Sequence, residues 1–272
     1  MDMPQPGLGL FSNENGLVVR RGPMDVVPYA VFEGTPPTPR QVSEVVSRGY
    51  GLHFVGAHSD LRFLTGSGLS HLSVSGYDLD TRVVSELRSL VSLHFLVAET
   101  PETNLSGLDA LRRYFGFLRD FESALRAPNL EVAEFHEVHE GSLPGIPRQI
   151  RELTLHGARQ VRELPLEEGI DAPELRELYL HGCRRFDVTS LTAFPRLEML
   201  TLESISNVVE IGSLADLPTL RQLSVLQCRS ADGIASLAEV RGLEVLVVGK
   251  LAEAVRDLAN RADPRWTLLK RL

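Results

Sequence analysis

The 272-residue chain lacks the features that would place it in several large classes of protein. It has only two cysteines, Cys183 and Cys228, which are too few for a disulfide framework and are typical of a reducing compartment. No stretch approaches the roughly 20 consecutive apolar residues that a membrane-spanning helix needs. The N-terminus also lacks the basic segment and long apolar run of a secretory signal. We therefore expect a cytoplasmic protein that does not bind a membrane.

Basic residues are in the minority. The chain has 28 Lys and Arg against 36 Asp and Glu, a formal net charge of -8. Binding of duplex nucleic acid needs a concentrated basic face, so we do not expect a nucleic-acid partner. We find no cluster of Lys and Arg that favours a phosphate site. The 43% hydrophobic and 24% charged residues are ordinary for a folded soluble protein and argue against disorder.

Catalytic motifs are missing too. The sequence has no Ser-His-Asp order with a nucleophile elbow, no HExxH and no paired CxxC. A GSG triplet lies within residues 61–75, but it falls between expected strands with no helix after it, which argues against a phosphate loop. We expect no enzymatic activity, no catalytic residue, no metal ligand and no cofactor.

What the sequence does contain is a repeat. The segments RELTLHGARQ (151–160) and RELYLHGCRR (176–185) are identical at seven of ten positions. Both fit a template with apolar residues at positions 1, 4 and 6. Position 1 is the residue directly before each segment, Ile150 or Leu175. The five clearest copies follow one another at steps of 25, 22, 23 and 23 residues and begin at Ile150, Leu175, Leu197, Leu220 and Leu243. Looser copies begin at Leu69, Leu90, Leu111 and Leu130, and residues 51–56 fit a further degenerate strand.

A period near 22 residues is the signature of a solenoid, in which short units stack to enclose a common core. Side chains alternate along a strand, so positions 4 and 6 share one side. Positions 3, 5 and 7 therefore point outward, onto the open face of a sheet.

The pattern LxxLxL followed two residues later by Asn or Cys resembles the leucine-rich-repeat family. Cys183 and Cys228 stand at that last position, whereas other copies have Ala158 or Ile205 there. Connecting segments such as EIGSLADLPTL (210–220) resemble the short 22-residue class. The resemblance implies an α/β solenoid, a right-handed horseshoe with a concave parallel β-sheet and short helical or irregular convex turns.

Three parts of the chain are expected. Residues 1–50 would form an N-terminal capping segment, irregular up to residue 37 and then helical from a capping box at Thr38 and Gln41. Residues 51–249 would hold the repeats. Residues 250–272 would form a C-terminal helical cap, because terminal units need a polar cover to stay soluble.

The template predicts which side chains face outward on the best-defined units. From them we select a candidate partner-binding surface: Glu134, His136, Glu152, Thr154, His156, Glu177, Tyr179, His181, Thr201, Glu203, Gln222 and Ser224. Five of the eight histidines fall at outward positions, and three of them share position 7 in consecutive units. Those three are predicted to form a column across adjacent strands: His136, His156 and His181.

Three interpretations of the column remain open. The histidine could be a by-product of repeat duplication. It could belong to a contact surface for a protein partner, with Tyr179 as an anchor, because tyrosine is enriched in binding hot spots. It could also ligate a metal, with Glu203 or Glu134 nearby. The acidic segment EVAEFHEVHE (131–140) is similarly either a solvated strand leading into a loop, or a cation site or docking patch.

These observations favour a non-enzymatic scaffold that binds a protein partner of unknown identity on its concave face. The alternatives are a metal-dependent protein or enzyme that uses the His/Glu column, and a structural subunit of a larger complex. The structural subunit predicts an apolar patch, which could include Phe115 and Phe117. Cys183 and Cys228 are expected to be buried structural thiols rather than nucleophiles, because no activating base is specified beside them.

Overall fold

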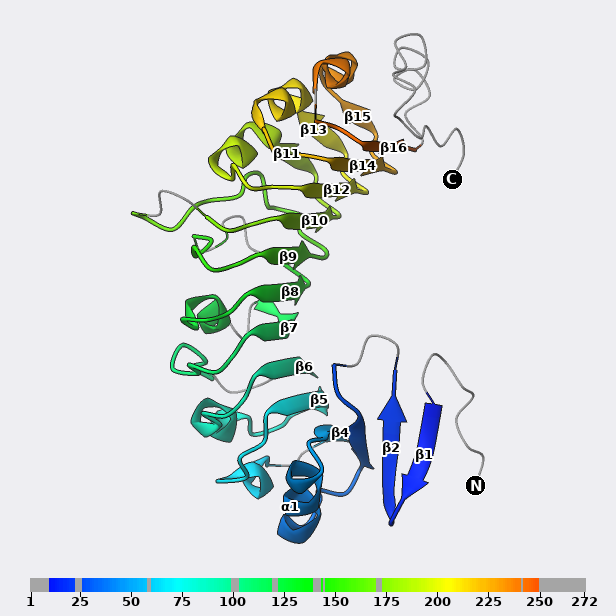
Figure 1. Ribbon diagram of the computed structural model, residues 1–272, viewed down its shortest axis with the longest axis vertical. Helices are drawn as coiled ribbons and strands as arrows, with labels where there is room; N and C mark the ends of the chain where they lie inside the picture. The colour runs from blue at the N-terminus through cyan, green and yellow to red at the C-terminus, as the bar shows by residue number, and fades with distance from the viewer. Residues whose placement is uncertain are drawn as a thin grey trace. The chain divides into compact units, whose positions relative to one another are not determined.

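The computed structural model consists of two compact units, Met1–Leu130 (unit 1) and Glu131–Leu272 (unit 2). It describes residues 10–22, 26–57, 60–98, 103–118, 122–138, 143, 145–169, 173–240 and 242–249. In both units, short strands alternate with turns or single turns of 3₁₀ helix (Figure 1).

Unit 1 contains a hairpin, one α-helix and a ladder of parallel strands. Strands β1, β2 and β3 pair antiparallel, and β3 to β7 then pair parallel in the order of the sequence. Its elements are β1 (Leu10–Glu14), β2 (Leu17–Arg21), β3 (Tyr29–Glu33), α1 (Pro39–Ser47), β4 (Gly51–Ala57), η1 (Arg62–Leu64), β5 (His71–Tyr77), η2 (Arg82–Glu86), β6 (Ser92–Ala98), β7 (Arg113–Phe117) and η3 (Glu122–Arg126).

The described part of residues 1–37 forms the regular strands β1, β2 and β3, so the expectation of an irregular segment was wrong there. Strands β1 and β2 are joined by the two residues Asn15 and Gly16, whose φ angles are 54° and 87°. Two positive φ values are what the tight turn of a two-residue hairpin requires, and Asn-Gly is the dipeptide that most readily adopts them. The Asn-Gly pair therefore indicates a hairpin in the sequence, although the Pro- and Gly-rich composition around it is typical of irregular structure.

Helix α1 begins as predicted. The Thr38 hydroxyl accepts a hydrogen bond from the Gln41 backbone N–H, and the Gln41 side chain accepts one from the Thr38 N–H at 2.9 Å. Pro39 occupies the first turn, where its missing N–H has no cost. The helix buries Val42 and Val45 on one side.

Unit 2 holds the clearest repeats. Its main sheet is parallel and contains β8, β9, β10, β12, β14 and β16. A second parallel sheet consists of the short strands β11, β13 and β15, which follow β10, β12 and β14 in the chain. The 3₁₀ helices stack beside one another along the unit (Figure 1). Its elements are β8 (Val132–His136), β9 (Glu152–Leu155), β10 (Glu177–His181), β11 (Arg185–Asp187), η4 (Val188–Ala193), β12 (Met199–Glu203), β13 (Asn207–Val209), η5 (Ile211–Asp216), β14 (Gln222–Leu226), β15 (Ser230–Ala231), η6 (Ile234–Glu239) and β16 (Val245–Val248).

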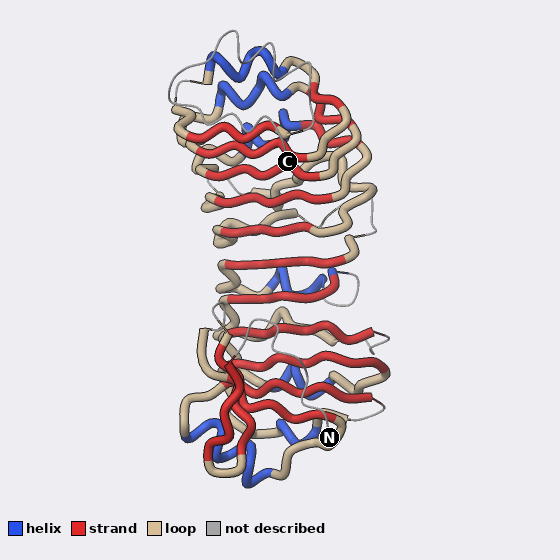
Figure 2. The backbone as a smooth tube through the Cα atoms, turned by 90° about the vertical axis from the view of Figure 1, so that its right-hand side faces the viewer, coloured by secondary structure: helices blue, strands red, loops and turns tan. Residues whose placement is uncertain are grey.

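The predicted register is confirmed. In β10, β12 and β14 the residues Leu178, Leu200 and Leu223 are direct cross-strand neighbours, and each is at most 2% exposed. The strands of each unit lie as successive rungs (Figure 2), so the apolar positions form continuous buried rows. The looser copy in β7 keeps the same register, with Tyr114 beside Leu93 and buried.

The domain boundaries proposed from the sequence stay a prediction. Strand β3 pairs in parallel with β4, so the parallel part of the sheet in unit 1 includes a strand that precedes residue 51, the predicted start of the repeats. The expected C-terminal cap at 250–272 lies outside the described residues.

Candidate functional site

The outward side chains of these strands of unit 2 form one surface, which we call the open face of unit 2. All twelve residues selected from the sequence lie on this face and are partly or fully exposed. Cross-strand pairing aligns them in rows. One row runs through Thr154, Tyr179, Thr201 and Ser224, each the neighbour of the next. The structure therefore places these residues together, while their role in binding stays a prediction.

A hollow of about 270 Å³ lies on this face, across β9, β10, β12 and β14. Seven of the twelve selected residues line it: Glu152, Thr154, Glu177, Tyr179, Thr201, Gln222 and Ser224. The other lining residues are Met199 and three leucines of the core rows, Leu153, Leu178 and Leu200. Among the described residues no Lys or Arg lines the hollow, and the ionisable groups in this lining are two carboxyl groups and one phenol.

Negative charge gathers at one end of the hollow. Glu152 and Glu177 are direct neighbours on β9 and β10. The pKa of Glu177 is raised, first by burial and then by the charges of Glu152 and Glu198. Adjacent carboxylates repel each other, and a cation placed between them would relieve that repulsion.

The Tyr179 hydroxyl is held in place beside the hollow. It donates a hydrogen bond of 2.5 Å to Oε2 of Glu203 on the neighbouring strand. Burial, followed by this bond to a carboxylate, raises the pKa of Tyr179 well above its ordinary value. Tyr179 is therefore a neutral donor at any physiological pH, fixed in one orientation.

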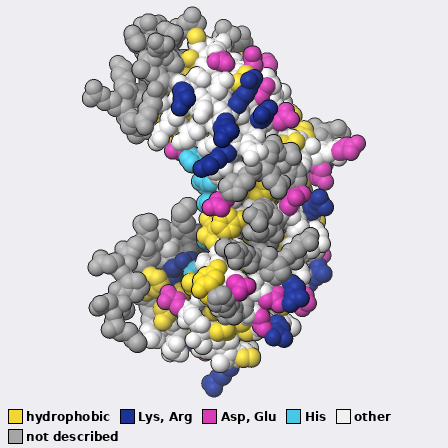
Figure 3. Space-filling view, turned by 180° about the vertical axis from the view of Figure 1, so that it is seen from behind, with side chains coloured by type: hydrophobic (Ala, Val, Ile, Leu, Met, Phe, Trp, Pro, Cys, Tyr) yellow, Lys and Arg dark blue, Asp and Glu magenta, His cyan; other side chains and the backbone are white. Residues whose placement is uncertain are grey.

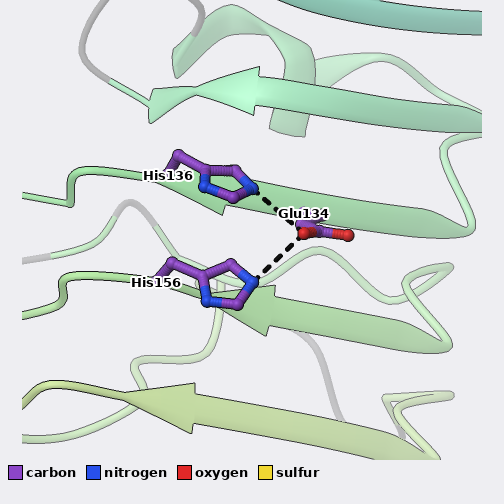
Figure 4. Close-up of side chains that lie close together, drawn as sticks. All are labelled: Glu134, His136 and His156. Carbon is purple, nitrogen blue, oxygen red and sulfur yellow. Dashed lines mark hydrogen bonds and ion pairs between the residues drawn. The ribbon is translucent and has the colours of Figure 1, made fainter. Parts of the chain in front are cut away.

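Next to the hollow lies a compact group that we call the histidine–glutamate cluster: Glu134, His136 and His156 (Figure 4). Oε1 of Glu134 lies 3.0 Å from Nε2 of His136 and 3.1 Å from Nε2 of His156. The two imidazole rings are stacked, with centroids 4.5 Å apart and an angle of 26° between their planes. The three side chains are 30–32% exposed. The cluster is thus largely packed but open to solvent on one side.

The third histidine of the column is further away. The His181 ring centroid lies 6.0 Å from that of His156, and its buried Nδ1 atom has no hydrogen-bond partner within the part of the chain that the structure describes. The pKa of His156 is lowered, first by burial and then by the charge of His136, against the opposing effect of Glu134. At neutral pH the His156 imidazole is therefore mainly neutral.

Comparison of the sequence with protein-family models and with curated proteins gives no match. Solved structures do match. TLR13, in a complex with the single-stranded RNA ssRNA13, superposes with a TM-score of 0.54 at 16% identity, covering 80% of this chain. This likeness agrees with the buried apolar rows and parallel rungs described above. The chain has the leucine-rich-repeat fold.

Two bacterial structures with the same kind of likeness give lower scores. An internalin, InlF from Listeria monocytogenes, has a TM-score of 0.44 at 11% identity and covers 89% of this chain and 79% of its own. A leucine-rich-repeat protein from Leptospira interrogans has a TM-score of 0.43 at 14% identity, over 74% and 66% of the two chains. The leucine-rich-repeat chain described here spans 36% of the TLR13 chain.

The histidines of unit 1 have other surroundings. The His94 ring packs edge-on against Phe115, with centroids 4.0 Å apart. Nδ1 of His53 hydrogen-bonds the Ser73 hydroxyl at 2.7 Å, and Ser73 is only 1% exposed although its position faces outward. Burial lowers the pKa of His71.

The lowered pKa of His71 predicts a loss of stability on acidification. The unfolded chain, in which the histidine titrates near pH 6.5, binds more protons than the folded chain as pH falls below that value. Wild-type Tm should therefore fall between pH 7 and pH 5.5 more steeply than the Tm of His71→Gln, as measured by circular dichroism. Between pH 7.5 and 8.5 both slopes should be equal, and equal slopes in the acidic window would contradict the prediction.

Both cysteines are buried, as predicted. Burial raises the pKa of Cys183 to about 12 and raises that of Cys228. A thiol that stays protonated is a poor nucleophile, so neither is suited to covalent catalysis.

The apolar patch expected for a structural subunit around Phe115 and Phe117 stays a prediction. Phe115 and Phe117 are half-buried. Within the ranges that the structure describes, the exposed large apolar residues are instead Phe11, Val18, Val26 and Tyr77.

A group of exposed arginines was not predicted from the sequence. Five exposed arginines lie in or beside the turns that follow β9, β10 and β14, and none forms an ion pair with another described residue: Arg159, Arg162, Arg184, Arg185 and Arg229. Figure 3 shows Lys and Arg side chains gathered on unit 2. The five arginines are separated in the sequence, and the stacking of repeats brings them onto one flank of the unit.

None of the helices in the described ranges is long and apolar enough to span a bilayer. Location in the cytoplasm stays a prediction.

Proposed function

We propose that this leucine-rich-repeat protein is a non-enzymatic scaffold whose open face on unit 2 binds a protein partner through a basic segment. The observation that carries the proposal is the hollow lined by Glu152, Glu177 and a row of hydroxyl groups. A lysine or arginine side chain would place its cation between the two carboxylates. Its backbone would then lie along Thr154, Thr201 and Ser224.

The rigidity of the surface supports this function. Each lining residue sits on a strand that is hydrogen-bonded to its neighbours, and Tyr179 is oriented by Glu203. A surface that is already ordered loses little conformational entropy on binding, so more of the contact energy becomes affinity. Tyrosine also supplies a large contact area with only two side-chain torsions.

The sign of the charge favours a protein over a nucleic acid. The TLR13 structure contains single-stranded RNA, and its likeness to this chain concerns the fold. Phosphates brought to the hollow would face Glu152 and Glu177, with no balancing Lys or Arg among the described lining residues. A basic peptide segment gains from the same carboxylates.

The experiment compares two charge-reversed forms of the full chain with the wild type. Glu152→Lys with Glu177→Lys reverses the charge in the hollow. The matched control, Glu163→Lys with Glu168→Lys, makes the same change in net charge at exposed carboxylates outside its lining. Each protein is immobilised, and captured proteins are quantified by mass spectrometry. The recovered partner is then titrated against all three forms.

The hollow variant should bind the partner at least tenfold more weakly, a loss of about 1.4 kcal/mol, because like charges now meet. The control should bind as the wild type does. Circular dichroism should give the same Tm for all three within a few degrees, since the substitutions are at partly or fully exposed positions. Equal capture by the three forms would show that the hollow is not the binding surface.

A further inference from the structure

The histidine–glutamate cluster brings three metal-ligating atoms to one point. Glu134, His136 and His156 each offer one ligand atom, and these three atoms all lie within 4.8 Å of one another. We propose that these three residues bind one divalent transition-metal ion of the zinc type on the open face of unit 2.

The spacing is close to what such an ion demands. Zinc lies about 2.0–2.2 Å from nitrogen and carboxylate ligands, so two ligands of a tetrahedral site are about 3.3 Å apart. The two measured oxygen–nitrogen separations are 3.0 and 3.1 Å. Small side-chain rotations would therefore open the group enough to admit an ion between the three atoms.

The backbone holds the ligands at this spacing. The N–H of His156 donates a hydrogen bond of 2.8 Å to the carbonyl of Phe135, which locks the rung of His156 against the rung of His136. Glu134 pairs across the same two strands with Thr154. The stacked rings limit each other's rotation, so the donor atoms are ordered before any ion arrives.

The protons can be accounted for. In the ion-free cluster a neutral imidazole donates its Nε2–H to Oε1 of Glu134. Metal binding needs the Nε2 lone pair, so the proton moves to Nδ1 of the same ring and the neutral charge is kept. In the metal-bound form the Glu134 carboxylate supplies one negative charge.

The donor set indicates which metals fit. Two imidazole nitrogens and one carboxylate oxygen suit Zn²⁺, Co²⁺, Ni²⁺ and Cu²⁺, whereas Mg²⁺ and Ca²⁺ prefer oxygen ligands throughout. Three protein ligands leave at least one position open. Since the cluster is about one-third exposed, water or a donor from outside the chain can complete the coordination.

The test uses the full chain without an affinity tag, treated with a chelator and dialysed. Zinc chloride is titrated calorimetrically, and Co²⁺ is followed by its visible absorption. One ion per chain should bind. His156→Gln and Glu134→Gln should each weaken zinc binding at least tenfold, because even loss of a residue that only supports a ligand costs 10–100-fold.

Two matched controls distinguish this site from general binding by histidines. His71→Gln lies in unit 1, and His181→Gln lies in the column but outside the cluster. Both should bind zinc within about threefold of the wild type. A second readout uses the unmodified protein: zinc should protect His136 and His156, but not His71, from diethyl pyrocarbonate, as mapped by mass spectrometry.

Absence of saturable zinc binding, or wild-type affinity in His156→Gln, would overturn the proposal. So would a loss in His181→Gln as large as that in His156→Gln, or equal labelling of His136 and His156 with and without zinc. The experiment needs no protein partner, so its failure is distinct from failure of the proposed scaffold function.

Discussion

Replacing Leu200 by alanine should lower the free energy of unfolding by about 2–5 kcal/mol. The side chain is 1% exposed and lies in the middle of β12, between Leu178 of β10 and Leu223 of β14. Its removal leaves a cavity in a row that continues through three repeats. Repeat units contact only their neighbours, so the space cannot be filled from a distance. Chemical denaturation followed by circular dichroism measures the change.

The neighbouring residue supplies the control. Thr201 follows Leu200 but faces the hollow and is half-exposed. Thr201→Ala should change the free energy of unfolding by no more than about 0.5 kcal/mol. A one-residue shift in register would exchange the two results, because side chains alternate along a strand. Equal losses from both substitutions would refute the register of the repeats.

This register could be predicted because the core rows leave a direct trace in the sequence. A strand of four or five residues cannot bury its apolar side alone, so every repeat needs a large apolar residue at the same positions. Leu178, Leu200 and Leu223 stand in that relation, and the structure makes them cross-strand neighbours. Alternation then placed the selected residues on the opposite face without further information.

The N-terminal hairpin was not predicted, because it lies outside the repeat pattern. Strands β1 and β2 do not follow the repeat template, and the surrounding Pro and Gly residues resemble a loop. Only the local turn signal of Asn15 and Gly16 distinguishes the hairpin. A search for repeats does not detect such a segment, because its pairing is set by a turn rather than by a period.

The candidate site was predictable in part. The template aligned His136 and His156, but it could not say that Glu134 lies between both Nε2 atoms. That arrangement depends on side-chain rotamers, which a pattern of positions does not contain. The flank of exposed arginines could not be predicted for a similar reason, since it arises from loops that stack across several repeats.

Replacing Gly76 by alanine should destabilise the protein by about 3–5 kcal/mol, near the upper end for a single substitution. Gly76 lies in β5 beside Gly56 of β4 and has a φ of 150°, which residues with a side chain rarely adopt. A Cβ atom there would lie 1.8 Å from the carbonyl oxygen of Gly56. Backbone cannot rotate away as a flexible side chain can, so β4 and β5 would have to separate.

Gly66 is a comparison position with a positive φ and no clash. Its φ is 65°, but an added Cβ would meet nothing within 4 Å. Gly66→Ala should therefore cost only the backbone strain of a left-handed residue, about 1–2 kcal/mol. Denaturation of both variants measures the difference, which combines the clash between β4 and β5 with the greater backbone strain of a side chain at a φ of 150°. If the two losses were equal, the close approach of Gly76 to Gly56 would have no energetic consequence, and the pairing of these strands at their C-terminal ends would be wrong.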